Sequence, residues 1–289
     1  MNGRLPETSI PPPPALPAAQ IALEAYWHVG RHLRVYASQI LVLSVICGFV
    51  QFATYFVVAI VVAGAGAGTQ TAALNLALVV TIVTVLLLGG TAIFIDSQRA
   101  IVLGLPPAVG HALRLRPGET RVLRAVCVYW LIVHLVPTFV VQMSYLAPFL
   151  QFDWPLRLPM PANFAFYWAW VLATVPLVVM SLPIVLFENA PAPLVEGRQR
   201  LDRNGGRMFI AGAIAFVPLG VVEIAIYALR DAAGSFADNP GMFLLVDLLI
   251  MSILQCMISL STILVMSALV AAAYMRLSPR IESVYRVFD

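Results

Sequence analysis

The sequence predicts an all-α membrane protein: a polytopic bundle of six transmembrane helices with short interfacial helices on its cytoplasmic side. Hydrophobic residues make up 61% of the chain and charged residues only 11%, whereas a soluble domain carries about 25% charged residues. The apolar residues form long stretches, each of which provides the ~20 residues that a helix needs to cross ~30 Å of hydrocarbon. The expected transmembrane helices are at about 38–63, 70–95, 122–150, 164–187, 208–229 and 243–275.

The N-terminal region divides into two parts. Residues 1–19 are polar and rich in proline, which favours a disordered and partly polyproline tail. This tail is either a plain cytoplasmic extension or a docking segment of the PxxP kind. Residues 20–36 form an amphipathic segment that suits a helix lying in the membrane interface. The first apolar run is far longer than the core of a secretory signal, so we expect an uncleaved anchor that opens a membrane domain over residues 20–277.

Proline and glycine mark the connections between the expected membrane helices. The second connection breaks at Gly104–Pro107 and continues as a short helix that ends near Arg116. The fourth connection begins a short helix at Pro193, and the Asn-Gly-Gly sequence at 204–206 ends it. Residues 278–289 are expected to form a short amphipathic tail.

The basic residues fall on alternating connections. All 17 of them are arginine, which excludes lysine-dependent chemistry such as a Walker A site or a Schiff base. Fifteen arginines lie on one side of the expected topology and two, Arg157 and Arg230, lie on the other. Positive charge in short loops marks the cytoplasmic side. The sequence therefore predicts a multi-pass protein of the bacterial cytoplasmic (inner) membrane with both termini in the cytoplasm.

Ten of these arginines cluster in three segments on the expected cytoplasmic side, where each is expected to contact anionic lipid headgroups. Anionic membrane lipid is thus the expected partner, together with a membrane protein or a second copy of the chain; no nucleic-acid partner is expected. The candidates for anionic-lipid contact are Arg31, Arg34, Arg114, Arg116, Arg121, Arg124, Arg198, Arg200, Arg203 and Arg207.

No sequence pattern indicates catalysis, a metal or a cofactor. HExxH, GxSxG, CxxC and EF-hand patterns are missing, and Gly64–Gly68 follows a membrane helix rather than the strand that a dinucleotide loop requires. His28 and His32 have a spacing that could hold a metal, but only Glu24 lies nearby to complete a site. We therefore expect a protein that is not an enzyme and binds no metal or cofactor.

Polar side chains inside the expected membrane helices are the candidates for an intramembrane site: Glu223, Asp247, Gln255 and His134. Ionisable groups are costly in hydrocarbon and usually face the bundle interior or a water-filled cavity. Glu223 and Asp247 lie at nearly matched depths, ~9 and ~6 Å from the outer ends of their helices. They could share a proton or hold a cation; alternatively, both side chains reach the outer interface or hydrogen-bond to Gln255 and serines.

Three consecutive motifs surround the fourth connection: PIVLFE at Pro183–Glu188, PLVEGRQRL at Pro193–Leu201 and DRNGGR at Asp202–Arg207. With the amphipathic lead into the first helix, they resemble the membrane domain of the glycerophosphoryl diester phosphodiesterase family and its uncharacterised bacterial six-helix relatives. The resemblance spans residues 20–277 and implies a membrane module that in some members accompanies a catalytic domain. The remaining length is too short to house the soluble phosphodiesterase domain.

Two function hypotheses follow from these features. The leading one is a non-enzymatic membrane scaffold or envelope-maintenance module that contacts anionic lipid through its arginines. The alternative is a transporter of a small solute, ion or lipid that uses an outer-leaflet carboxylate pair. The first places the functional groups in the arginine-rich segments, and the second places them at Glu223 and Asp247.

The arginine asymmetry generates a topological prediction. Reporter fusions after residues 67, 157 and 236 should report the outer side, and fusions after residues 115, 203 and 289 should report the cytoplasm. The reason is that the segments assigned to the cytoplasmic side contain fifteen of the 17 arginines. Paired alkaline phosphatase and fluorescent-protein reporters measure this directly. One reversed connection would remove the six-span arrangement.

Overall fold

The computed structural model describes residues 15–61, 89–107, 120–130, 180–188, 190, 192–234 and 240–278. These residues are mostly helical, and none of them lies in a strand, which confirms the all-α class for this part of the chain. Three of its helices are long and apolar enough to cross a membrane, over Leu33–Val58, Gly205–Val222 and Leu249–Leu277. The expected spans at 70–95, 122–150 and 164–187 lie largely outside the described residues.

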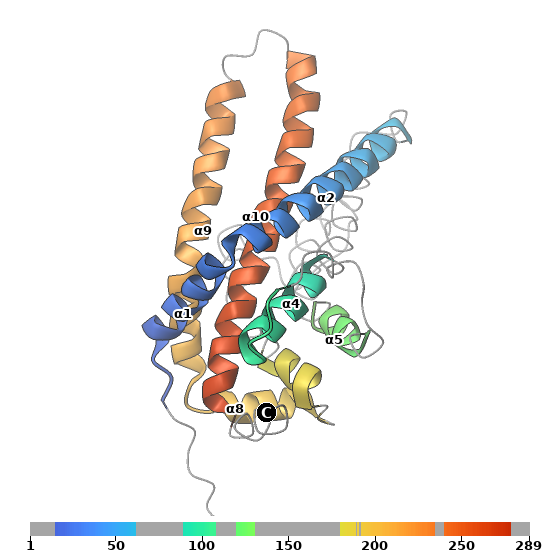
Figure 1. The fold of residues 1–289 in the computed structure, drawn as a ribbon. Coiled ribbons are helices and arrows are strands. Elements are labelled where there is room, and N and C mark those ends of the chain that lie inside the picture. Colours follow the sequence, from blue (N-terminus) through green and yellow to red (C-terminus); the bar gives the residue numbers. More distant parts are fainter. Residues whose placement is uncertain are drawn as a thin grey trace, which may run out of the picture.

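Among the described elements, α2, α9 and α10 are long apolar helices, and the shorter elements precede α2 or lie between α2 and α9 in the chain (Figure 1). Their bounds are α1 Ala18–Arg31, α2 Leu33–Val61, α4 Thr91–Val102, α5 Thr120–Trp130, η5 Ile184–Glu188, α8 Pro193–Leu201, α9 Gly205–Gly234 and α10 Pro240–Leu277. The amphipathic segment expected at 20–36 is divided by a break at His32 into α1 and the first turn of α2. The short helix expected from Pro193 is α8, which has proline in its first turn.

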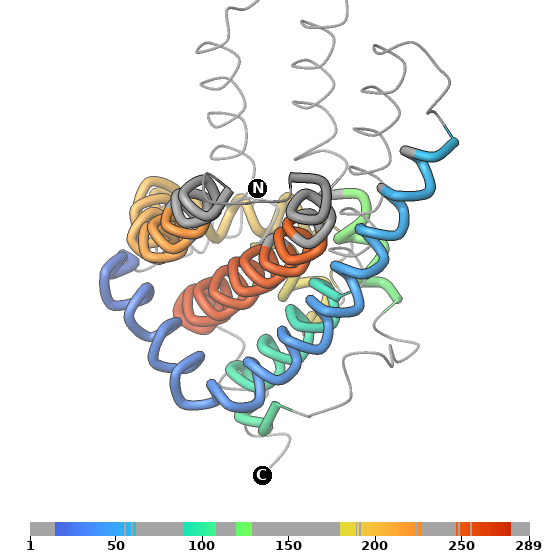
Figure 2. Tube along the Cα trace, turned by 90° about the horizontal axis from the view of Figure 1, so that it is seen from above, coloured from blue at the N-terminus to red at the C-terminus, as the bar shows by residue number. Residues whose placement is uncertain are grey.

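Helix α10 is the central element of the described structure, with α1, α2, α4 and α9 packed around it (Figures 1 and 2). Its last turns belong to the largest hydrophobic core, and their side chains are small. Ala268, Ala271 and Ala273 are fully buried, and Ala272 is 4% exposed. Small side chains let helix backbones approach closely, and van der Waals packing is the main source of helix association in a membrane.

The helices α2 and α10 approach each other closely at Gly48. A methyl group at Gly48 would lie 2.5 Å from Cγ1 and 2.8 Å from Cα of Ile253. The second atom belongs to the backbone, so a side-chain rotation of Ile253 cannot relieve the overlap. Cys47 and Cys256 are buried at the same contact, where they pack as small apolar groups. Glycine at position 48 therefore sets the distance between α2 and α10.

Large apolar side chains are exposed along the outward faces of the long helices. On α2 they include Val57 and Ile60, which are 58% and 62% exposed, and on α9 they include Val217 and Val221, which are 63% and 60% exposed. Soluble proteins rarely expose contiguous apolar surface on this scale. Hydrocarbon solvates such faces at no cost, so they agree with the membrane location that the three apolar helices indicate.

The Gly48 contact predicts a packing-specific loss of stability. Gly48→Ala should destabilise the protein by about 1–3 kcal/mol, because overpacking forces the two backbones apart. The matched control is Gly220→Ala in α9, where an added methyl group has nothing within 4 Å and helix propensity favours alanine by about 1 kcal/mol. Thermal unfolding in detergent measures both variants. Equal stability of the two would contradict the close approach.

Candidate functional site

We define the arginine-rich end as the part of the bundle that extends from α8, the start of α9 and the end of α10 up to α1. Helix α1 crosses α9 and α10 and meets α2 farther along α10, and α4 and α5 lie beside this part (Figure 1). Most of the described arginines expected to contact lipid are exposed there. The exposed ones are Arg31, Arg34, Arg121, Arg124, Arg198, Arg203 and Arg207. Arg200 differs from them, because its guanidinium is used inside the protein. Arg114 and Arg116 lie outside the described residues.

Helix α1 is attached to the bundle along one face. Ile21, Ala22 and Ala25 are buried against α9 and α10, and the Tyr26 hydroxyl donates a hydrogen bond of 2.5 Å to the carbonyl oxygen of Ala215. Burial raises the pKa of this hydroxyl, which keeps it a donor. Before the helix begins, the backbone N–H of Leu16 donates to Oδ1 of Asn204 at 2.9 Å. These contacts fix α1 across the two membrane helices.

The opposite face of α1 is exposed and apolar. Leu23 and Trp27 are 68% and 65% exposed, one helical turn apart. The guanidinium of Arg31 lies over the Trp27 ring, 5.3 Å from its centroid. Tryptophan and arginine side by side are typical of the headgroup level of a membrane. The amphipathic segment thus packs on the protein with one face and leaves an aromatic face free.

At the junction of α1 and α2 the rings of His28, His32 and Tyr36 gather. The His28 and His32 centroids are 5.0 Å apart, and His28 Nε2 shares a hydrogen bond of 3.1 Å with the Tyr36 hydroxyl. Burial, followed by the neighbouring His32 and Arg31, lowers the pKa of His28 to about 4. His28 is therefore neutral at pH 7. Within the described part of the chain, no group of three histidine, cysteine or acidic side chains could hold a metal.

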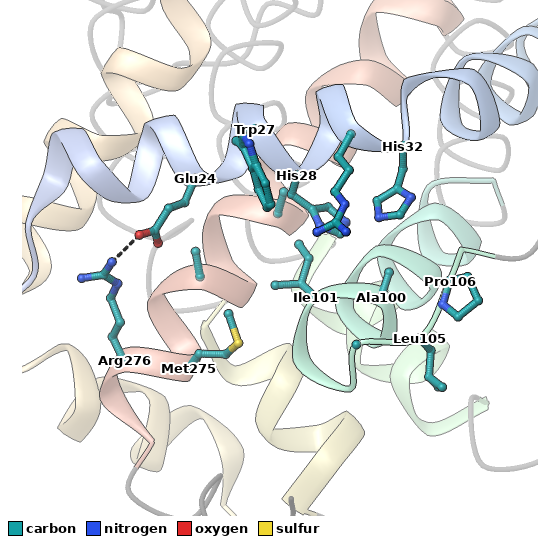
Figure 3. A pocket seen from close by; sticks show the side chains of 14 residues that line it. Glu24, Trp27, His28, His32, Ala100, Ile101, Leu105, Pro106, Met275 and Arg276 are labelled. Atoms are coloured by element: carbon teal, nitrogen blue, oxygen red, sulfur yellow. Dashed lines mark hydrogen bonds and ion pairs between the residues drawn. The ribbon is translucent and has the colours of Figure 1, made fainter.

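A cleft of about 630 Å³ opens between α1, α4 and α10 (Figure 3). One wall comes from the polar and aromatic side of α1, a second from the end of α4 and the turn after it, and the third from the end of α10. At the edge of the cleft Arg276 forms an ion pair with Glu24. The lining residues are Glu24, Trp27, His28, Arg31, His32, Ala100, Ile101, Gly104, Leu105, Pro106, Ala268, Ala272, Met275 and Arg276.

A second cluster of polar groups joins η5, α8 and α10. The guanidinium of Arg200 binds both carboxylate oxygens of Glu188, at 2.6 and 2.5 Å. Tyr274 donates its hydroxyl proton to Glu188 Oε1, and Ser278 Oγ lies 2.9 Å from Arg200 Nη1. The Arg200 guanidinium also lies over the Tyr274 ring, 5.5 Å from its centroid. We call these four residues the Glu188 cluster.

The Glu188 cluster keeps its carboxylate charged. Burial by itself would raise the pKa of the Glu188 carboxyl, but the hydrogen bonds from Arg200 and Tyr274 outweigh it and hold the pKa below its ordinary value. Burial by itself would lower the pKa of the Arg200 guanidinium, but Glu188 and Tyr274 raise it above its ordinary value. The Glu188 and Arg200 side chains are only 9% and 15% exposed. A bidentate pair that is buried to this extent holds η5 and α8 together, and its guanidinium is not available to bind lipid.

A third polar group lies buried between α4 and α10. Gln98 Nε2 donates to the carbonyl oxygen of Ser267 at 2.8 Å, and the hydroxyls of Ser97 and Ser267 contact each other. Gln98 Oε1 is buried, and no other described residue hydrogen-bonds to it. Side-chain hydrogen bonds between membrane helices each contribute about 0.6 kcal/mol. These hydrogen bonds therefore add little energy but favour one orientation of α4 against α10.

The structure places the expected carboxylate pair on neighbouring helices. Glu223 lies in α9 and Asp247 in α10, and the two helices pack together. Asp247 is half-buried and has interaction partners of its own. The side chains of Glu223 and Gln255, and all of His134, lie outside the described residues. The carboxylate pair therefore stays a prediction.

Sequence reasoning missed the groups that organise this end of the protein. The sequence pattern identifies Glu188 only as part of a motif and Ser278 only as the start of the C-terminal tail, and it does not single out Trp27 or Tyr274. One signal is present in the sequence: Glu188 is the lone acidic residue at the end of an apolar run, and Arg198 and Arg200 follow it ten and twelve residues later. An ionisable side chain at the end of a membrane-spanning segment is expected to pair with a side chain of opposite charge.

Comparisons with protein-family models, with curated proteins and with solved structures found no match for this chain.

The Glu188 cluster predicts a pH-dependent stability difference. Glu188→Gln should lower the free energy of unfolding by about 2 kcal/mol at pH 7, the order of magnitude for breaking a buried ion pair with partial retention of its hydrogen bonds. Because the folded-state pKa lies below the ordinary 4.5, the contribution is fully present above that value and is lost as the pH falls beneath it.

Thermal unfolding of the wild type and Glu188→Gln from pH 7 to pH 3.5 measures this difference. The control is Glu196→Gln, since Glu196 is 3.8 Å from Arg200 and its side chain is 33% exposed, so its pair contributes little. A gap between wild type and Glu188→Gln that widens toward low pH would contradict the assignment.

Proposed function

We propose that this chain is a non-enzymatic integral membrane protein, a scaffold or envelope-maintenance module that contacts anionic lipid through its arginine-rich end. The proposal rests on one observation: apolar and cationic surfaces are segregated. The long helices α2 and α9 expose large apolar side chains along their length, whereas exposed arginines gather on and around α1, α5 and α8. A surface of this kind suits a bundle embedded in hydrocarbon with one end among headgroups.

Orientation follows from the same segregation. Arginines near helix ends favour the cytoplasmic side during insertion, and that leaflet carries the anionic lipids. We therefore place the arginine-rich end in the cytoplasmic leaflet of a bacterial inner membrane, with both termini in the cytoplasm. Each arginine near an anionic surface contributes about 1 kcal/mol. Several of them acting together give a preference for anionic lipid without a specific site.

Rigidity supports a scaffolding role. The Glu188 cluster joins η5 and α8 to the end of α10, and the ion pair between Glu24 and Arg276 joins α1 to the same helix. The exposed arginines are thus carried on short elements that are held to the bundle core. A fixed arrangement of charge loses less entropy on binding lipid than a flexible tail does.

The second candidate function is a transporter of a small solute, ion or lipid. Polar side chains buried along the membrane-spanning part of α10 favour it, since intramembrane polar groups mark ion and substrate pathways. Gln98 and Ser267 are fully buried at the α4–α10 contact, and Asp247 is half-buried farther along α10. Replacing Glu223 by Gln and Asp247 by Asn together should abolish uptake by proteoliposomes in that case. An unchanged rate of uptake in the double variant would exclude the transporter and leave the scaffold as the candidate function.

Lipid retention tests the scaffold proposal. The triple variant Arg34→Gln, Arg198→Gln, Arg203→Gln removes exposed charge but leaves the Glu188 cluster intact. Its enrichment of anionic over neutral lipid should fall by about two orders of magnitude, since each arginine contributes ~1 kcal/mol and every ~1.4 kcal/mol is tenfold in affinity. Mass spectrometry of lipid that copurifies from a defined mixture measures the enrichment.

The matched control replaces the same three residues by lysine, which keeps the charge and should keep the enrichment. Equal retention of neutral and anionic lipid by the wild type would refute the scaffold proposal. So would a loss of enrichment in the lysine variant as large as in the glutamine variant.

A further inference from the structure

We infer that the cleft between α1, α4 and α10 binds the phosphate and glycerol of one anionic phospholipid. This inference rests on the proposed function, because it requires the arginine-rich end to meet anionic lipid. It goes further because it assigns one binding site that holds one phospholipid per chain, whereas the exposed arginines attract anionic lipid over a broad surface.

The size of the cleft suits a lipid headgroup. Ligand sites for organic molecules are typically about 300–1,000 Å³, and this cleft has about 630 Å³. A bare phosphate ion would fill a small part of that volume. The space accommodates a phosphodiester together with its glycerol and the first carbons of the acyl chains. Its position beside the ends of the membrane-spanning parts of α2 and α10 places it within reach of the bilayer.

The charge of the cleft matches one phosphodiester. Among the described residues, its ionisable lining apart from the histidines consists of two arginines and one glutamate, which gives a net charge of +1. Glu24 and Arg276 neutralise each other in their ion pair. Arg31 is exposed and, within the described residues, forms no ion pair. Its guanidinium is therefore the group that meets the phosphate, with the geometry that favours arginine over lysine at such sites.

The rings on α1 complete the polar wall of the cleft. Stacking of Arg31 on Trp27 holds the guanidinium in place. His28 lines the cleft beside it and is neutral at pH 7, so it can hydrogen-bond to a phosphate or glycerol oxygen without adding charge. Figure 3 shows the Trp27 and His28 side chains along α1 and the His32 side chain just after it.

The walls from α4 and α10 expose apolar side chains to the cleft, and such a surface favours an amphiphile over a free anion. Ile101 and Met275 line the cleft, and Leu105 is 51% exposed at its edge. Leu105 reaches this position because the chain leaves α4 through Gly104, whose φ of +64° is in the left-handed region. Glycerol and acyl carbons would cover these apolar side chains, and the burial of apolar area would favour binding of an amphiphile.

Native mass spectrometry of the full chain in detergent, titrated with phosphatidylglycerol, tests the site. The wild type should retain one phosphatidylglycerol under collision energies that strip the remaining adducts, and phosphatidylcholine should not replace it. Arg31→Gln should weaken this one adduct at least tenfold. Leu105→Glu, which places a negative charge at an exposed position, should do the same and provides an independent variant if Arg31→Gln lowers stability.

The triple variant Arg34→Gln, Arg198→Gln, Arg203→Gln is the matched control, because none of its residues lines the cleft. It should lose weak adducts and keep the tight one. Failure of the proposed function would show as no preference for anionic lipid anywhere. Failure of the cleft alone would show as a preference that Arg31→Gln and Leu105→Glu leave unchanged. Displacement of the tight adduct by millimolar inorganic phosphate would identify a free-anion site and overturn the lipid assignment.

Discussion

Close packing around the last turns of α10 is the constraint on which the rest of the structure depends. In hydrocarbon there is no water to drive apolar helices together, so association relies on the contact that small side chains permit. The buried alanines of α10 let α1, α4 and α9 approach from different sides, and Gly48 lets α2 cross farther along. Larger residues at these positions would separate the helices that carry every polar group described above.

Polar interactions act at the end of this packed core, where they hold the short elements in place. Glu188, Arg200 and Tyr274 bring η5 and α8 to α10, and Glu24 with Arg276 brings α1 to it. The pair of Glu188 with Arg200 contributes more, because breaking it would leave a buried charge without a partner, whereas the pair of Glu24 with Arg276 is more exposed and contributes less. The cleft exists because α1 and α4 are both held against α10 and leave a space between them.

Much of the fold was predictable because it depends on local properties. Apolar length identified the helices that became α2, α9 and α10, and Pro193 marked the start of α8. The Glu188 cluster was not predictable, since Arg200 and Tyr274 lie 12 and 86 residues away from Glu188 in sequence. Arg200 resembles its exposed neighbours in sequence, and only the fold shows that its guanidinium is occupied. The cleft combines three distant segments and has no local signature.

The depth of Trp27 tests the central claim, that the arginine-rich end is a packed unit lying at headgroup level. In a variant in which Trp130, Trp154, Trp168 and Trp170 are phenylalanine, Trp27 is the one tryptophan left of five. Its fluorescence in vesicles can be quenched by phospholipids brominated at different acyl positions. Because Trp27 is 65% exposed on α1, shallow bromines should quench it most strongly. No quenching by any position, or strongest quenching by the deepest bromines, would contradict the account.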